Sequence, residues 1–148
     1  LANKHELQVT SYELLVTRRL IASMSGNIRT HKDLIVWKRS VYLVTTIYKV
    51  TEAFPKTEMF GLTSQIRRAA VSIPSNIAEG SGPGQTKADQ FLHIATGSAS
   101  ELETQFIIAR NLCYINQNQY WEIEKELQEI MRMITAFTHT LSRDNAKQ

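Results

Sequence analysis

The chain has 148 residues, of which 43% are hydrophobic and 21% charged, with a net charge of +3 and a pI near 9.1. This composition is typical of a single soluble domain with a sizeable core. One cysteine excludes an internal disulfide or a cysteine metal cluster, and no apolar run approaches the roughly 20 residues that span a bilayer. We also expect no secretory signal, which makes a reducing cytoplasm the simplest location.

Residues 1–30 are expected to form a loosely ordered N-terminal extension or leader. Residues 1–23 could lie outside the native reading frame or be a real extension, and both interpretations stay open. Thr10 and Glu13 have the spacing of a capping box, which predicts a short helix as far as Ile21. The main domain is predicted over residues 31–143, followed by a tail at residues 144–148.

The first long helix is predicted to begin at Asp33 and to end before Pro55, because proline disfavours the α conformation of the preceding residue. Its apolar residues recur with helical spacing in two adjacent stripes. The first stripe contains Leu34, Trp37, Val41, Val44 and Tyr48, and the second contains Leu43, Ile47, Val50 and Phe54.

The second helix is predicted from about Glu58 to Glu79. Its inward stripe contains Leu62, Ile66, Ala69, Ile73 and Ile77. Pro74 lies inside this stretch and should kink the axis, and a break at Ile73 is the alternative. Residues 80–84 are rich in glycine and predict a loop.

The third helix is predicted to start at a capping box formed by Thr86 and Asp89. Its predicted core stripe contains Phe91, Ala95, Ser98, Leu102, Gln105, Ala109 and Leu112. Four small residues at positions 97–100 predict the closest helix crossing there.

The fourth helix has the strongest periodicity in the sequence. Its apolar residues are Tyr120, Ile123, Leu127, Ile130, Ile134, Phe137 and Leu141, and its other face is charged. Four long helices with short connections predict an all-α fold, an antiparallel up-down-up-down four-helix bundle.

No catalytic or metal-binding constellation is apparent in the sequence. The four histidines, at positions 5, 31, 93 and 139, have no metal-ligand spacing, and the Glu-x-x-His pattern of di-iron bundles is absent. The glycine-rich loop lacks the Walker spacing, so we interpret it as a plain connection. We therefore expect no enzymatic activity, no catalytic residue, no metal and no cofactor.

Charge is divided unevenly along the chain. Residues 31–68 carry seven Lys or Arg and three Asp or Glu, whereas residues 69–143 carry five and eight. This division suits head-to-tail self-association, and it also suits an anionic partner for the basic half. Many bundles show such an asymmetry with no partner at all, and that interpretation remains open.

Four basic residues are the candidate nucleic-acid-binding site. Arg67 and Arg68 flank the inward direction of the second helix, and arginine matches the geometry of phosphate and carboxylate groups. Lys38 and Arg39 on the first helix could extend the same basic surface. The alternative is that all four are simply solvated.

Three segments carry a resemblance to a known family. They are residues 60–80, which read FGLTSQIRRAAVSIPSNIAEG, residues 31–37, which read HKDLIVW, and residues 97–105, which read GSASELETQ. The chain resembles the bacterial four-helix bundle proteins encoded in intervening sequences of 23S ribosomal RNA genes, sometimes labelled S23 ribosomal proteins. The resemblance covers about residues 30–140.

The resemblance implies a bundle whose second helix continues through Pro74, and it brings no catalytic residues. It also implies self-assembly, because relatives are similar to the accessory variability protein of diversity-generating retroelements, a five-fold ring that binds nucleic acid. The leading hypothesis is therefore a non-enzymatic homopentamer that binds RNA or DNA through a basic surface including Lys38, Arg39, Arg67 and Arg68. The alternatives are a protein–protein scaffold and a metal or cofactor bundle, for which core ligands are missing.

Overall fold

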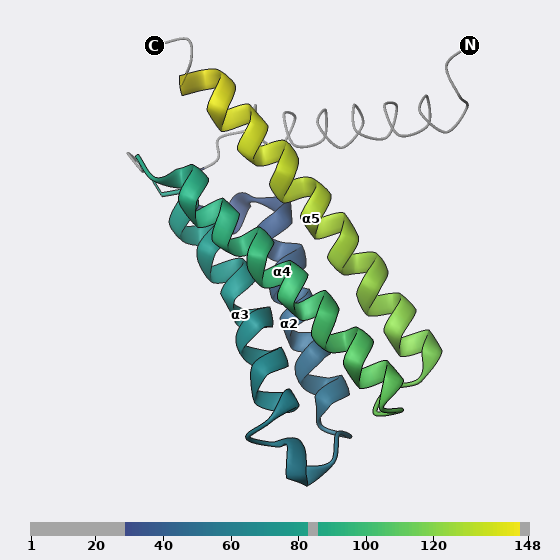
Figure 1. Ribbon diagram of the computed structural model, residues 1–148. Coiled ribbons are helices and arrows are strands. Elements are labelled where there is room, and N and C mark those ends of the chain that lie inside the picture. Colours follow the sequence, from purple (N-terminus) through teal and green to yellow (C-terminus); the bar gives the residue numbers. More distant parts are fainter. Residues whose placement is uncertain (1–28, 83–85, 146–148) are drawn as a thin grey trace, which may run out of the picture.

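Four antiparallel helices form the body of the computed structural model, which describes residues 29–82 and 86–145 (Figure 1). The helices are α2 (Ile35–Thr51), α3 (Leu62–Gly80), α4 (Ala88–Asn111) and α5 (Gln117–Asn145). Two short 3-10 turns, η1 (His31–Asp33) and η2 (Lys56–Glu58), precede α2 and α3. The described residues include no strand, and the predicted all-α four-helix bundle is confirmed.

The helices follow one another around the bundle. Helix α3 packs against α2 and α4, and α5 packs against the same two helices. Helices α3 and α5 therefore occupy opposite corners (Figure 1). None of the described helices combines the length and apolar character needed to cross a membrane.

The predicted inward stripes of α3 and α5 are confirmed. On α3, Ile66, Ala69, Ile73 and Ile77 are buried, and Leu62 is partly buried. On α5, every predicted member from Tyr120 to Phe137 is buried. Leu141, the last predicted member, lies beyond the described side chains.

The predicted stripes of α2 and α4 are partly wrong. On α2 the core side is the second stripe, with Leu43 and Ile47 buried, whereas Val41 and Tyr48 of the first stripe are exposed. Ser40 and Thr51 are also buried on α2, and each hydroxyl donates to the carbonyl four residues earlier, so neither buried oxygen lacks a partner. On α4 the core side is Leu92, Ala95, Ser98, Ala99, Leu102, Gln105, Phe106 and Ala109. Phe91 is only partly buried and Leu112 is 50% exposed.

The helix starts differ from the expected ones. Helix α3 begins at Leu62 rather than near Glu58, and the Glu58 carboxylate accepts the backbone N–H of Leu62 at 2.9 Å. Helix α4 begins after Lys87 with no side-chain cap, so the predicted box of Thr86 and Asp89 is wrong. Residues 1–28 lie outside the described residues, and so does the capping box predicted at Thr10 and Glu13. The domain boundaries therefore stay a prediction.

Helix α3 continues through Pro74 to Gly80, so the alternative of a break at Ile73 is wrong. Helices α3 and α4 share the most extensive interface in the bundle. Ala95 and Ala99 are fully buried on α4, and the hydroxyls of Ser72 and Ser98 lie 2.8 Å apart across the interface. Gly97 has no atom within 4 Å of the position a Cβ would take, so it faces away from the crossing.

Helix α4 ends in a Schellman motif with a cysteine at the left-handed position. The N–H of Tyr114 donates to the carbonyl of Ala109, and the N–H of Cys113 donates to that of Arg110, both at 2.9 Å. Cys113 has a φ of 59°. A residue with a Cβ is strained in this conformation, whereas glycine is not.

We therefore expect Cys113→Gly to raise the free energy of unfolding by about 1 kcal/mol. Urea unfolding of purified protein checks this. Cys113→Ser is the matched control, because it removes the thiol but keeps the Cβ, and it should leave stability unchanged. An equal gain in both variants would show that the thiol, and not the backbone, causes the effect.

Candidate binding groove on helix α3

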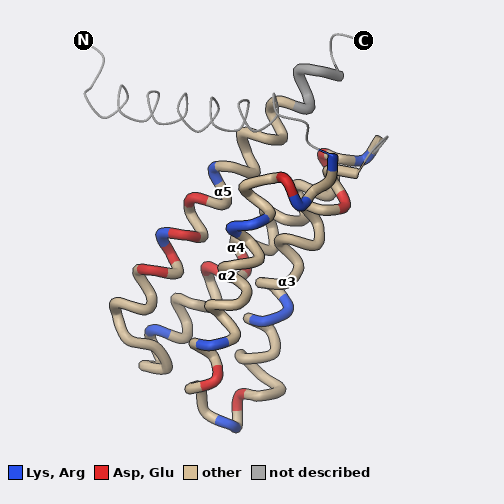
Figure 2. The backbone as a smooth tube through the Cα atoms, turned by 180° about the vertical axis from the view of Figure 1, so that it is seen from behind, with Lys and Arg blue, Asp and Glu red and all other residues tan. Residues whose placement is uncertain are grey.

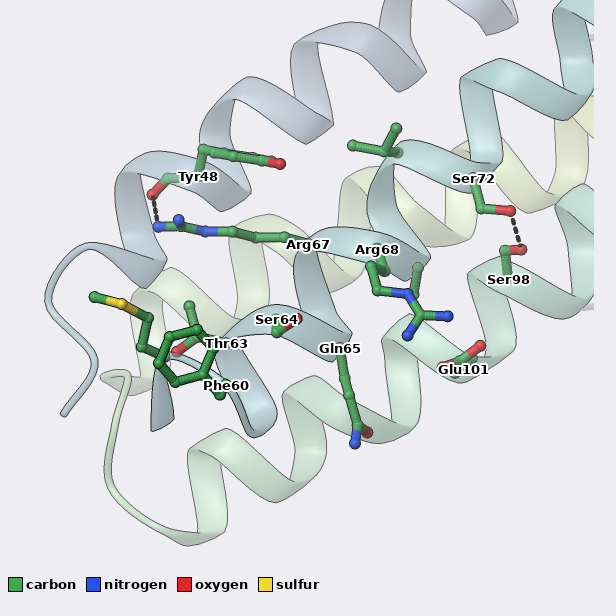
Figure 3. Close-up of a pocket in the computed structure, with 13 residues that line it drawn as sticks. Tyr48, Phe60, Thr63, Ser64, Gln65, Arg67, Arg68, Ser72, Ser98 and Glu101 are labelled. Carbon is green, nitrogen blue, oxygen red and sulfur yellow. Dashed lines mark hydrogen bonds between the residues drawn. The ribbon is translucent and has the colours of Figure 1, made fainter. Parts of the chain in front are cut away.

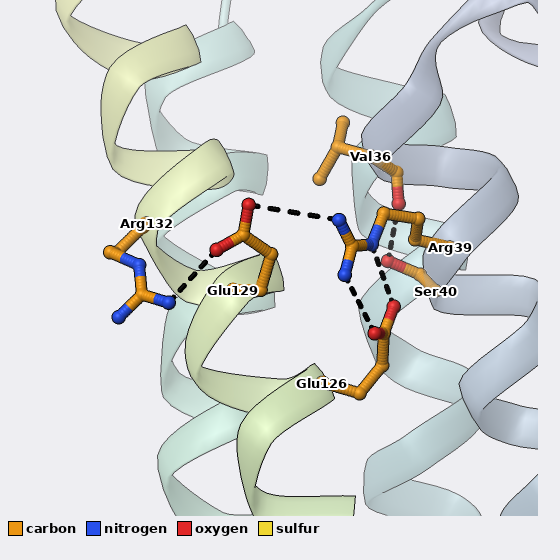
Figure 4. A network of polar contacts seen from close by, with 6 residues as sticks. All are labelled: Val36, Arg39, Ser40, Glu126, Glu129 and Arg132. Atoms are coloured by element: carbon orange, nitrogen blue, oxygen red, sulfur yellow. Dashed lines mark hydrogen bonds and ion pairs between the residues drawn. The ribbon is translucent and has the colours of Figure 1, made fainter. Parts of the chain in front are cut away.

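Arg39 of α2 points toward α5 and pairs with two glutamates (Figure 4). Its Nε and one terminal nitrogen donate to the two oxygens of Glu126, each at 2.7 Å. Its other terminal nitrogen lies 3.6 Å from Glu129, which also pairs with Arg132 at 2.8 Å. This guanidinium therefore joins α2 to α5 within the chain.

Arg67 of α3 points toward α2. Its guanidinium lies 4.6 Å from the ring centroid of Tyr48, a cation–π arrangement. Its Nε donates to the Thr51 hydroxyl at 2.9 Å. A terminal nitrogen donates to the Tyr48 carbonyl at 3.4 Å (Figure 3). These contacts fix the side chain in one orientation at the seam between the two helices.

Arg68 is exposed and has no hydrogen bond or ion pair among the described residues. Figure 3 shows it on the side of α3 that faces α4, near Glu101. Because no acid in the described part of the chain forms an ion pair with it, its guanidinium group is open to a partner.

Lys38, the remaining candidate, is exposed on α2 close to Asp33. The backbone N–H groups of Thr30 and Arg29 donate to the Asp33 carboxylate and lower its pKa, and the charge of Lys38 lowers it further. The three arginines among the four candidates thus face different helices: Arg39 faces α5, Arg67 faces α2 and Arg68 faces α4. The role of the four candidates in nucleic-acid binding stays a prediction.

A groove of about 820 Å³ runs along the outer face of α3, between α2 and α4 (Figure 3). Its polar and charged lining comprises Thr63, Ser64, Gln65, Arg67, Arg68, Ser72, Ser98 and Glu101. Its apolar and aromatic lining comprises Tyr48, Met59, Phe60, Ala69 and Val71. Phe60 is 94% exposed and Met59 is 56% exposed, an unusual state for large apolar side chains that sit side by side.

Part of the groove is rigidly built. The Ser72 and Ser98 hydroxyls pair across it, and the Asn76 amide donates to Ser72. Thr63 is buried at the other end, and its hydroxyl has no hydrogen-bond partner among the described residues. A buried polar atom without a partner is rare in folded proteins and marks this end of the groove.

Glu58 holds the segment that carries Met59 and Phe60. One oxygen of its carboxylate caps α3 at Leu62, and the other accepts the hydroxyl of Tyr114 at 3.2 Å. Burial raises the pKa of Tyr114, and the hydrogen bond to Glu58 raises it further. A Cβ on Gly61 would lie 2.6 Å from the same carboxylate, so glycine leaves room for this cap.

The sequence analysis named Arg67 and Arg68, which line this groove, but it did not predict the groove or its apolar residues. Met59, Phe60 and Tyr48 were not predicted as site residues. The available signal was an adjacent Met-Phe pair in a short connection after Pro55, where polar residues are usual.

Charge separates between the two halves of the bundle (Figure 2). Helices α2 and α3 together contain five Lys or Arg and one Asp or Glu. Helices α4 and α5 together contain four and eight. The sequence asymmetry therefore becomes a spatial one, with a basic α2–α3 side and an acidic α4–α5 side. The described residues hold no group of three or more side chains suited to a metal ion.

Comparison with known proteins places this bundle in a family. The family model of the 23S rRNA-intervening sequence protein matches residues 32–136, which is more than half of the chain. The chain belongs to this family.

A solved member of the S23 ribosomal protein family shares the fold of this intervening-sequence protein. It is a protein of unknown function from Bacteroides thetaiotaomicron, with a TM-score of 0.64 and 23% sequence identity. The similarity covers 71% of this chain and 96% of the Bacteroides chain. A comparison with curated proteins gives no match.

Proposed function

We propose that this intervening-sequence protein acts by binding rather than by catalysis, as a homo-oligomeric scaffold. Its copies associate head to tail, which means that one face of each copy contacts a different face of the next. The observation that carries the proposal is the pairing of a basic side containing an open groove with an acidic side on the opposite half of the same bundle. Surfaces of opposite charge on one chain favour contact between different faces of two copies. Such contacts close into rings when the rotation between copies allows it. The family resemblance suggests a ring of five.

Nucleic-acid binding is the second candidate function. It is favoured by the excess of cations on α2 and α3, where Lys38 and Lys49 are exposed and Arg68 has no acidic partner among the described residues. Arg67 is partly exposed and held in place by Tyr48, so it could contact a phosphate without losing much conformational freedom. Arg39 is less suited, because Glu126 and Glu129 already neutralise it. Such contacts would tolerate many sequences and weaken with salt.

Two measurements on the same preparation test these functions. Sedimentation velocity over a range of protein concentrations should give a mass several times that of one 16.9 kDa chain. A single-chain mass at every concentration would contradict the scaffold.

Binding of labelled RNA and DNA should then be measured between about 50 and 200 mM salt. Lys38→Glu/Lys49→Glu is the matched variant, because both residues are exposed on α2 and neither lines the groove. If nucleic acid is a partner, the wild type binds at low salt and the variant binds at least tenfold more weakly while keeping its mass. If the wild type does not bind at low salt, the scaffold function alone remains.

A further inference from the structure

We infer that the α3 groove of one copy receives the N-terminal part of α5 from a second copy, with Trp121 as the central side chain. This inference rests on the proposed self-assembly and names the two surfaces that carry it. The groove surface comprises Met59, Phe60, Arg68 and Val71. The ridge surface comprises Trp121 and Glu122 on α5.

The groove surface has the composition of an interface core. Phe60, Met59 and Val71 are large apolar side chains in contact with water, and Arg68 lies beside them without an acidic partner among the described residues. Burying aromatic and arginine side chains in the centre of an interface contributes most of the binding energy in typical complexes. With Arg67, Arg68 and Glu101 as its charged members, the groove has a net positive charge.

The ridge surface is complementary to the groove. Trp121 is 58% exposed, although tryptophan is usually well buried in a protein that has no partner. Glu122 is exposed next to it, and residues 121–129 contain four Glu and one Lys. An exposed indole with acidic neighbours fits a groove that offers exposed aromatic carbon and an arginine.

The two surfaces also lie at matching heights on opposite corners of the bundle. Because α3 and α4 are antiparallel and α4 leads directly into α5, helices α3 and α5 begin at the same end (Figure 1). Arg68 lies six residues into α3 and Trp121 four residues into α5, or about 9 and 6 Å along the axes. Copies can therefore dock side by side with their bundles pointing the same way, and such a contact closes into a ring when the rotation between successive copies allows it.

The test uses two variants that each damage one surface. The groove variant is Phe60→Ser/Arg68→Glu, and the ridge variant is Trp121→Ser/Glu122→Lys. All four residues are exposed, so the helix content and the melting temperature of each variant should stay close to those of the wild type. Tyr42→Ser/Lys49→Glu is the matched control, because it removes an exposed aromatic ring and reverses a charge outside the groove lining.

We expect the groove and ridge variants each to self-associate at least tenfold more weakly than the wild type, and the control to keep the wild-type mass. An equimolar mixture of the two variants should form a dimer and nothing larger. The groove variant still has an intact ridge, and the ridge variant still has an intact groove, so each pair can make one productive contact.

Three results would overturn the inference. They differ in whether the proposed self-assembly fails as well. If the wild type is a single chain in solution, the proposed self-assembly fails and this inference fails with it. If the wild type is oligomeric and either variant keeps the wild-type mass, only the choice of surfaces fails. If the wild type is a single chain and the groove variant loses RNA binding, the groove is a nucleic-acid site instead.

Discussion

Replacing Phe106 by alanine is expected to lower the free energy of unfolding by about 3–5 kcal/mol, the usual cost of emptying a phenylalanine site in a core. Phe106 is 2% exposed and is one of the largest fully buried side chains of the bundle. A domain of this size has a total stability of about 5–15 kcal/mol, so the substitution removes a large part of the total and should lower the melting temperature. Urea unfolding followed by circular dichroism measures the change.

Leu112→Ala is the matched control on the same helix. Leu112 was predicted from its spacing to lie in the core, but it is 50% exposed at the C-terminal end of α4. We expect its replacement to change stability by less than about 0.5 kcal/mol. Equal losses at the two positions, or a larger loss at Leu112, would mean that α4 is rotated about its axis relative to the structure described above.

The difference between α4 and α5 explains how much of the fold can be predicted. Helix α5 has one apolar stripe and one charged face, so only one rotation buries its apolar residues, and the prediction was correct. Helix α4 has adjacent apolar pairs, Phe91 with Leu92 and Ile107 with Ile108, together with small residues on several sides. Two stripes of α4 are then almost equally apolar. Which of them faces the core depends on how α4 packs against α3 and α5. That information is not local in the sequence.

The candidate site also depends on contacts between helices that are far apart in the sequence. Charges can be counted in a sequence, but their partners come from other helices: Glu126 lies 87 residues from Arg39, and Thr51 lies 16 residues from Arg67. The sequence therefore identified four cations without showing that two of them, Arg39 and Arg67, are held by side chains of neighbouring helices. Phe60 was missed because a connecting residue has no helical periodicity that would indicate its exposure.

The division of charge connects the fold with the proposed function. Within one chain, Arg39 links a basic helix to the acidic helix beside it, so part of the asymmetry is neutralised across the seam between α2 and α5. Across the seam between α3 and α4, Arg68 and Glu101 line the same groove without pairing. The α3 groove therefore keeps an arginine that no ion pair among the described residues occupies, beside the exposed apolar side chains of Met59 and Phe60.

Arg39→Met is expected to lower the free energy of unfolding by about 1–3 kcal/mol, the second-largest effect after the core substitution. The variant keeps most of the aliphatic stem but leaves the Glu126 carboxylate without its two 2.7 Å donors. The Glu129 side chain, only 11% exposed, would retain Arg132 as a partner. The side chain of Arg39 is 37% exposed, so solvent screening keeps the expected loss well below that of a fully buried pair.

Lys38→Met is the control for Arg39→Met, because it removes one positive charge from the neighbouring position on the same helix and leaves the ion pairs between α2 and α5 intact. Lys38→Met should change the free energy of unfolding by less than about 0.5 kcal/mol. The difference in the free energy of unfolding between the two variants should become smaller at about 1 M salt, but it should not disappear. Salt screens ion pairs that are shielded from water less than it screens exposed ones. If the two substitutions had equal effects at low salt, the ion pairs between α2 and α5 would add nothing to the stability of the bundle. Apolar packing, including that of Leu43 and Ile47, would then hold α2 in place.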